Sequence, residues 1–189
     1  MPDPNPPPPP RAGAPAPASA PAPHQVHSAR PSLVIASHGP VLFGVWTGIE
    51  PRADDLRHGT AILLQRARAR GGAALIVGLP PGMPLPNPEI RTILIAELSK
   101  LGAHTHCGAT VIPGEGFARS ALRAAVSTLQ LLVRVRHPEK IFSTAKEAAQ
   151  FVHTHLVRLQ KEAPPADDLA STFEELTRQY WQSAPTARR

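Results

Sequence analysis

The sequence predicts a single α/β domain with a mixed, mostly parallel β-sheet covered by helices, in the order β-β-α-β-α-β-α-β-α. Three observations lead to this class. Short apolar runs, typical of buried strands, alternate with longer segments whose apolar residues recur at helical spacing. Only a short turn separates the first two runs, which predicts an antiparallel hairpin. A helix follows each later strand, and such units form right-handed crossovers between parallel strands.

Composition divides the chain of 189 residues into three parts. Residues 1–31 hold 12 of the 24 prolines and almost no bulky apolar side chain, so we predict a disordered Ala/Pro-rich arm. Residues 32–161 carry the α/β pattern and are numerous enough to bury a core. For residues 162–189 we predict a linker, a short amphipathic helix and a tail. That helix either packs back on the domain or docks on a partner.

The first half of the domain has the pattern of a hairpin, a helix and a buried strand. Residues 33–36 and 41–46 are the predicted hairpin strands. From Pro51 onward the apolar residues follow helical spacing until a pair of glycines ends the helix. The apolar run 73–79 does not alternate with polar residues, which is typical of a central strand covered on both faces.

The second half begins with a well-defined helix start. Asn87 is a favourable N-cap, Pro88 fits the first helical position, and Gly102 closes the helix. The remaining predicted elements of the domain are a strand at 104–112, a helix at about 117–134, a strand at 140–143 and a helix from Thr144.

Charge and cysteine content limit the classes of partner and the cellular compartment that we expect. The net charge of +6 comes from residues 31–162, which carry 15 basic and 9 acidic residues. Most of these basic residues are isolated arginines without interleaved aromatic residues, so we do not expect a nucleic-acid partner. The single cysteine, Cys107, precludes a disulfide within the monomer and fits a reducing compartment. With no secretory leader pattern and no apolar run of about 20 residues, we expect a cytoplasmic protein without a membrane span.

Three segments carry a resemblance to a known family: the hairpin around 41–47, the strand 75–79 with its loop and helix, and residues 111–117 leading into the next helix. With the order of elements over about residues 32–160, they resemble the STAS domain (the sulphate-transporter and anti-sigma-factor-antagonist module), in particular its divergent SpoIIAA-like relatives. The resemblance implies a non-enzymatic regulatory module that binds another protein. Many such domains are switched by phosphorylation of a serine or threonine at the start of the second helix, next to the positive end of the helix dipole.

This chain departs from the family at that switch. The segment from Pro80 to Glu89 contains no serine or threonine, so we expect a STAS-like domain without the phospho-switch. The expected protein-interaction surface joins the start of the second helix to the loop before the third. It consists of Asn87, Arg91, Gly114, Glu115, Gly116 and Arg119. The identity of the partner protein, and whether the domain forms a homodimer, stay open.

Other chemistry-bearing residues favour structural roles. His104 and His106 share one face of a strand, but a zinc site needs at least three protein ligands, so we expect no metal and no cofactor. Cys107 lies on the opposite face, where a lone cysteine is more typical of a core than of a nucleophile. The loop glycines Gly114 and Gly116 lack the lysine of a P-loop and the spacing of a dinucleotide fingerprint, and are typical of a turn.

A second hypothesis is a carrier or sensor of a small apolar or lipid ligand. Some distant relatives with this topology hold lipids between sheet and helices, and the broad apolar face of the helix at 117–134 fits such a role. The hypothesis needs an apolar cavity of roughly several hundred Å³, and a fully packed interior would exclude it. A third hypothesis, an enzyme, would need polar side chains that converge in one cleft, and the sequence offers no obvious set.

Overall fold

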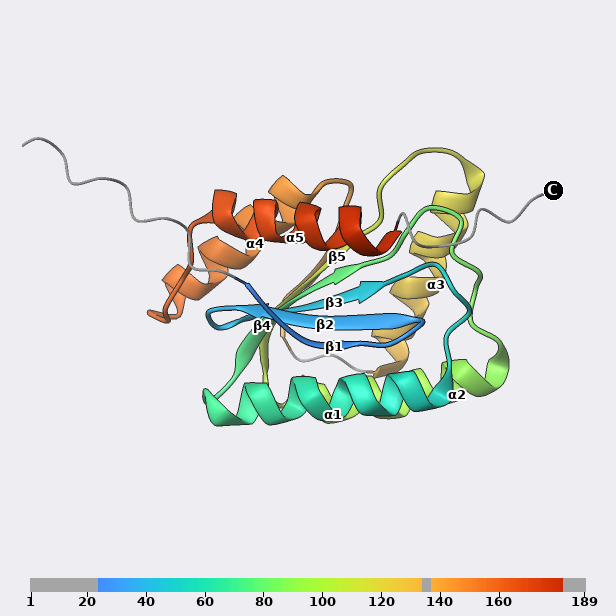
Figure 1. Ribbon diagram of the computed structural model, residues 1–189, viewed down its shortest axis with the longest axis horizontal. Helices are drawn as coiled ribbons and strands as arrows, with labels where there is room; N and C mark the ends of the chain where they lie inside the picture. The colour runs from blue at the N-terminus through green and yellow to red at the C-terminus, as the bar shows by residue number, and fades with distance from the viewer. Residues whose placement is uncertain (1–23, 134–136, 182–189) are drawn as a thin grey trace, which may run out of the picture.

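The computed structural model describes residues 24–133 and 137–181, which form a six-stranded sheet with helices on both faces (Figure 1). The strands lie in the sheet in chain order: β1 (Gln25–Ala29), β2 (Leu33–His38), β3 (Val41–Trp46), β4 (Ala73–Gly78), β5 (Thr105–Val111) and β6 (Glu139–Phe142). The helices are α1 (Ala53–Ala69), α2 (Pro88–Gly102), α3 (Phe117–Val133), α4 (Ala145–Arg158) and α5 (Ala166–Trp181).

The predicted α/β class and the mixed sheet are confirmed. Strands β1 to β3 pair antiparallel, and β3 to β6 pair parallel. Each parallel step is made by a crossover through α1, α2 or α3, so these three helices share one face of the sheet. Among the described residues, no helix is both long enough and apolar enough to cross a membrane.

Strand β1 corrects the predicted boundary of the N-terminal arm. It occupies Gln25–Ala29, within the segment 1–31 that composition predicts to be disordered. Its side chains are exposed or half-buried, and it pairs with β2 through backbone hydrogen bonds and a 2.8 Å bond between His27 Nε2 and Ser37 Oγ. An edge strand of this kind needs few apolar side chains, so hydrophobic patterning does not reveal it. Residues 1–23, the rest of the predicted arm, lie outside the described residues.

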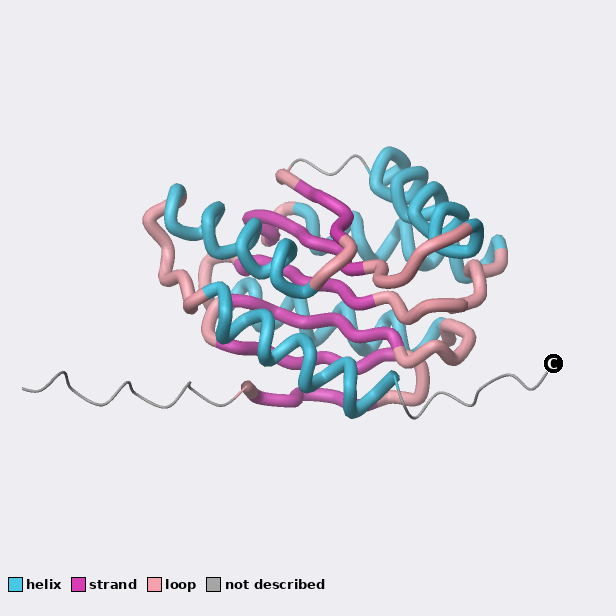
Figure 2. The backbone as a smooth tube through the Cα atoms, turned by 90° about the horizontal axis from the view of Figure 1, so that it is seen from above, coloured by secondary structure: helices cyan, strands magenta, loops and turns pink. Residues whose placement is uncertain are grey.

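Helices α4 and α5 cover the other face of the sheet, with α5 lying over the strands (Figure 2). Phe173 and Leu176 of α5 are buried in the same core as the strands beneath them. A buried hydrogen bond of 3.0 Å joins His38 Nδ1 of β2 to Thr172 Oγ1 of α5. The predicted C-terminal helix therefore packs back on the domain, while the predicted tail, residues 182–189, lies outside the described residues.

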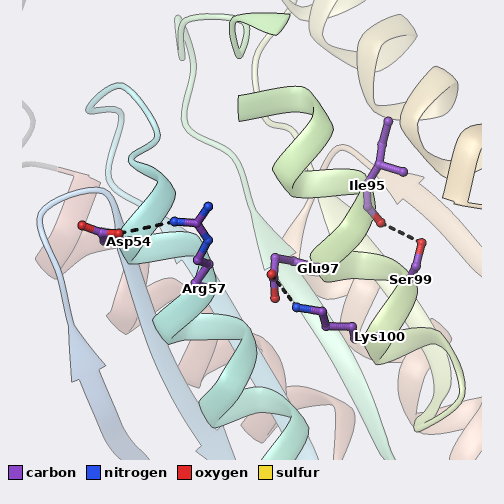
Figure 3. A network of polar contacts seen from close by, with 6 residues as sticks. All are labelled: Asp54, Arg57, Ile95, Glu97, Ser99 and Lys100. Carbon is purple, nitrogen blue, oxygen red and sulfur yellow. Dashed lines mark hydrogen bonds and ion pairs between the residues drawn. The ribbon is translucent and has the colours of Figure 1, made fainter. Parts of the chain in front are cut away.

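On the face covered by α1, α2 and α3, buried hydrogen bonds join the start of α1 to the residue before β2. The carboxylate of Asp55 is buried and accepts hydrogen bonds from the backbone N–H and the hydroxyl of Ser32, at 3.2 and 2.8 Å. Its neighbour Asp54 is exposed and pairs with Arg57 on the same helix at 3.6 Å (Figure 3). Of these two neighbouring carboxylates, the buried Asp55 links α1 to the residue that precedes β2, and the exposed Asp54 pairs only within its own helix.

Candidate functional site

An apolar cavity of about 150 Å³ lies between the sheet and helices α1, α2 and α3. Strands β2 to β5 form its floor, and Met83 and Pro86, from the loop before α2, close one side. Its lining is mainly aliphatic and includes Ile35, Leu75 and Val77 from the sheet and Leu63, Leu98 and Val126 from the helices. The cavity is larger than the neighbouring pocket described below, and it is the candidate functional site.

The cavity depends on a glycine in the middle of β3. Gly44 lines it and pairs with Ile35 of β2 and Val77 of β4. A Cβ atom placed on Gly44 would meet Val77 Cγ2 at 3.9 Å, an ordinary contact, and no other atom of the described residues within 4 Å. The backbone there is not in the left-handed region, so the conformation does not require glycine. The missing side chain leaves volume that the covering helices do not fill.

Helix α3 forms one wall of the cavity. Its Leu122 is buried, and Val126 and Leu129 are half-buried over the cavity. The broad apolar face predicted for residues 117–134 is therefore divided, because Leu132, expected on that face, is exposed. Among the described helices, α3 packs against α2, and Leu132 lies outside the buried part of that packing.

Two carboxylates lie among the polar residues of the lining. Glu97 of α2 has a side chain only 10% exposed, and its Oε1 accepts a 2.7 Å hydrogen bond from Lys100 Nζ (Figure 3). Glu139 of β6 lines both this cavity and a smaller pocket beside it. Its carboxylate rests over Gly108 of β5, where a Cβ atom would approach Oε1 to 2.8 Å. Gly108 is therefore needed for Glu139 to lie in this position.

A smaller pocket of about 30 Å³ adjoins the cavity beside Glu139. The two share lining residues, among them Leu75, Leu98 and Gln130. His137 lines the smaller pocket, and its Nε2 lies 3.2 Å from Glu139 Oε1. The His137 side chain is only 9% exposed, and its Nδ1 is buried without a hydrogen-bond partner among the described residues.

The predicted interaction residues lie mainly at one edge of the sheet. Asn87 and Arg91 are exposed at the start of α2, and Asn87 Oδ1 accepts a 2.9 Å hydrogen bond from the backbone N–H of Ile90, which confirms the predicted N-cap. Gly114, Glu115 and Gly116 are exposed in the loop before α3. The two loops follow the neighbouring parallel strands β4 and β5, so they lie at the same edge. Both loop glycines have φ of +90°, as a turn requires.

Arg119 differs from the other predicted interaction residues because it is engaged within the fold. Its Nε donates to the backbone oxygen of Ile112 at 3.1 Å, and its Nη2 donates to Ser143 Oγ. These bonds tie the first turn of α3 to the end of β5 and to the loop before α4. The guanidinium of Arg119 therefore has a structural role within the domain.

The remaining candidates have structural surroundings. Cys107 is fully buried, as predicted for a core residue, and burial raises the pKa of its thiol to about 12. His104 Nε2 accepts a 3.3 Å hydrogen bond from Arg68 Nε. The pKa of His106 is lowered, first by burial and then by the nearby charges of Lys161 and His137. Within residues 24–133 and 137–181, no three His, Cys, Asp or Glu side chains come together as a metal site.

The second hypothesis from the sequence required an apolar cavity between sheet and helices but did not say which strand residues would line it. The sequence contains one signal for that position. The run VLFGVW of β3 places a glycine inside an otherwise bulky buried strand. Such a glycine often marks a bulge or a place where another group approaches the backbone closely.

Fold and site together define an α/β domain with an apolar cavity between the sheet and helices α1 to α3, and with a polar end at His137 and Glu139. No protein-family model, curated protein or solved structure matches the chain. The resemblance to the STAS domain therefore stays a prediction from the order of elements.

Proposed function

We propose that this chain is a non-enzymatic binding protein for a small apolar ligand, which it holds between the sheet and helices α1 to α3. The cavity of about 150 Å³ is the observation that carries the proposal. In another protein, an engineered cavity of about this size with an aliphatic and aromatic lining binds benzene or xenon. The volume is below the several hundred Å³ that a lipid carrier needs, so a single six-membered ring with a short substituent is the fitting size.

Energetics support a ligand in this position. An enclosed cavity destabilises a fold by roughly 24 cal/mol per Å³, which gives at most about 4 kcal/mol for this volume. An apolar molecule that fills the cavity restores the dispersion contacts that the lining side chains lack. The free energy gained on binding therefore comes from the cavity itself and needs no rearrangement of the sheet.

Thermal unfolding of the full chain in the presence of toluene tests this function. A ligand that binds only the folded state raises the midpoint of unfolding with its concentration. We expect a saturable rise for toluene and no such rise for an equal concentration of methanol, which is too polar to gain from the cavity. A midpoint that stays constant or falls up to the solubility limit of toluene would contradict the proposal.

A second candidate function is the STAS-like protein-interaction module. The observation in its favour is the exposed edge formed by Asn87, Arg91 and the loop 114–116, next to Phe117, whose side chain is 89% exposed. Aromatic residues and arginines are both enriched in protein interfaces. Such a module would bind another protein without phosphorylation of the α2 start.

Charge reversal at Arg91 tests the second candidate. We expect native mass spectrometry of the gently purified wild-type protein to show one partner protein at fixed stoichiometry, and Arg91→Glu to lose it. Arg57→Glu, an exposed arginine on α1, is the matched control and should retain the partner. A partner that stays bound to Arg91→Glu, or no partner on the wild type, would count against this surface.

A further inference from the structure

The outer face of helix α3 is apolar and carries no charged side chain. Phe117, Leu131 and Leu132 are 89%, 79% and 54% exposed within the described part of the chain. The two arginines of the helix, Arg119 and Arg123, are half-buried on its other side. Each of the other four helices has exposed charged residues, such as Arg57 on α1, Lys100 on α2, Lys146 on α4 and Glu174 on α5. An exposed apolar face of this kind is typical of an interaction surface.

The exposed residues of this face form a straight stripe along α3. The stripe consists of Phe117, Ala121, Ala124, Thr128 and Leu131, which follow one another at alternating spacings of four and three residues. This is the spacing of the seam between two paired helices. Large apolar residues stand at the two ends of the stripe and small residues lie between them. Small residues in the middle let a second helix approach to about 8 Å between the helix axes.

The hydroxyl groups on this face are already hydrogen-bonded within the helix. Thr128 Oγ1 donates to the backbone oxygen of Ala124 at 2.9 Å. Ser120 Oγ, beside the stripe, donates to the backbone oxygen of Gly116 at 3.2 Å. A partner that covers these two hydroxyls leaves neither proton without an acceptor, so their loss of water costs little free energy.

The stripe is complementary to a second copy of itself. When two α3 helices lie antiparallel about a two-fold axis at Ala124, Ala124 faces Ala124 of the second copy and Phe117 faces Leu131 of the second copy. Ala121 then lies beside Thr128 of the second copy. Because the axis repeats each contact, one surface supplies both sides of the interface, as in the commonest class of symmetric dimer.

The charges of the domain also favour a second copy on this face. The protein has a net charge of +6, so two copies repel each other in most orientations. A pair of α1 helices would bring exposed arginines such as Arg57 and Arg68 together. The neutral stripe of α3 brings no like charges into contact.

The area of the contact predicts a weak dimer. Phe117 and Leu131 of both copies bury on the order of 150 Å² each, and the residues between them bring the total to roughly 1,000 Å². This is the low end for a specific interface, so we expect a dissociation constant on the order of 10 to 100 µM. Unfolding measured at a few micromolar therefore reports on the monomer.

From this geometry we infer that the protein self-associates through the outer face of α3, as an antiparallel helix pair centred on Ala124. None of the five stripe residues lines the cavity, so the inference is independent of the proposed ligand.

Sedimentation equilibrium of the full chain tests the inference. Between about 5 and 500 µM, a range that brackets the expected dissociation constant, the mass of the wild type should rise from that of a monomer toward that of a dimer. Ala124→Glu places two carboxylates face to face at the axis and should weaken the association at least tenfold. Ala61→Glu is the matched control, because Ala61 is an exposed alanine on α1, and it should associate like the wild type. Circular dichroism checks that each variant is folded.

A charge-swap mixture tests the position of the two-fold axis. Ala124→Lys alone should also stay monomeric, whereas an equal mixture of Ala124→Glu and Ala124→Lys should dimerise, because opposite charges then face each other at the axis. A wild type that is monomeric throughout the range, or an Ala124→Glu variant that associates like the wild type, would overturn the inference. A mixture that stays monomeric would overturn the placement of the axis at Ala124.

Discussion

Replacement of Phe173 by alanine is expected to destabilise the protein by about 3 to 5 kcal/mol, the largest loss that we predict for a single side chain. Phe173 is 3% exposed and docks on Gly78 of β4, where a Cβ atom would come within 2.8 Å of its ring. Its ring also meets Trp181 edge-on, with centroids 6.2 Å apart. Truncation removes the largest of the buried α5 side chains that pack on the sheet, and chemical denaturation with urea measures the change.

Phe117→Ala is the matched control for Phe173→Ala. Phe117 is the same residue type at the start of α3, but it is 89% exposed, so its loss should change the free energy of unfolding by no more than about 0.5 kcal/mol. If Phe173→Ala lost less than about 1 kcal/mol, α5 would not be an integral part of the fold, and the sheet face beneath it would need another cover.

Gly44→Val is expected to increase the free energy of unfolding by about 1 kcal/mol and to abolish the binding of toluene. The increase has two causes: valine replaces a conformationally free glycine in a central strand, and its methyl groups fill existing volume. The loss of binding follows because the same volume is no longer open to a ligand. Most substitutions of buried residues destabilise, so a stabilising one at this position is a specific result.

Gly44→Ala should have an intermediate effect on stability and on toluene binding. A single methyl group occupies less of the cavity, so toluene should still bind, but more weakly than to the wild type. Stability and affinity should therefore change in opposite directions across the series from glycine through alanine to valine. A loss of more than about 1 kcal/mol in Gly44→Val would mean that the strand has no room there and that the cavity is smaller than described.

The elements that are predictable from the sequence are those with a strong local pattern. The non-alternating run 73–79 predicts a strand covered on both faces, and β4 is buried between α2 and α4 as a central strand. Asn87 predicts the helix start that it caps. Strand β1 escapes prediction because Gln25–Ala29 is held by backbone pairing at the edge of the sheet and not by apolar side chains.

The site is less predictable than the fold because a cavity is the volume that remains after all elements have packed. Gly44 signals a gap in β3, but whether a helix fills that gap depends on where α3 settles against α2. The polar end joins His137 and Glu139 to Gly108 on the neighbouring strand, a contact between segments about 30 residues apart. The spacing of residues along the sequence therefore does not predict that these side chains lie together.

Whether the cavity above Gly44 binds a small apolar ligand is decided by an NMR titration of the wild type and Gly44→Val with toluene, run side by side. For the wild type we expect saturable shifts of backbone amides along β3, β4 and β5 and in α3 around Leu122, and for Gly44→Val we expect no such shifts. Equal shifts in both proteins, or shifts confined to residues outside the cavity, would contradict it.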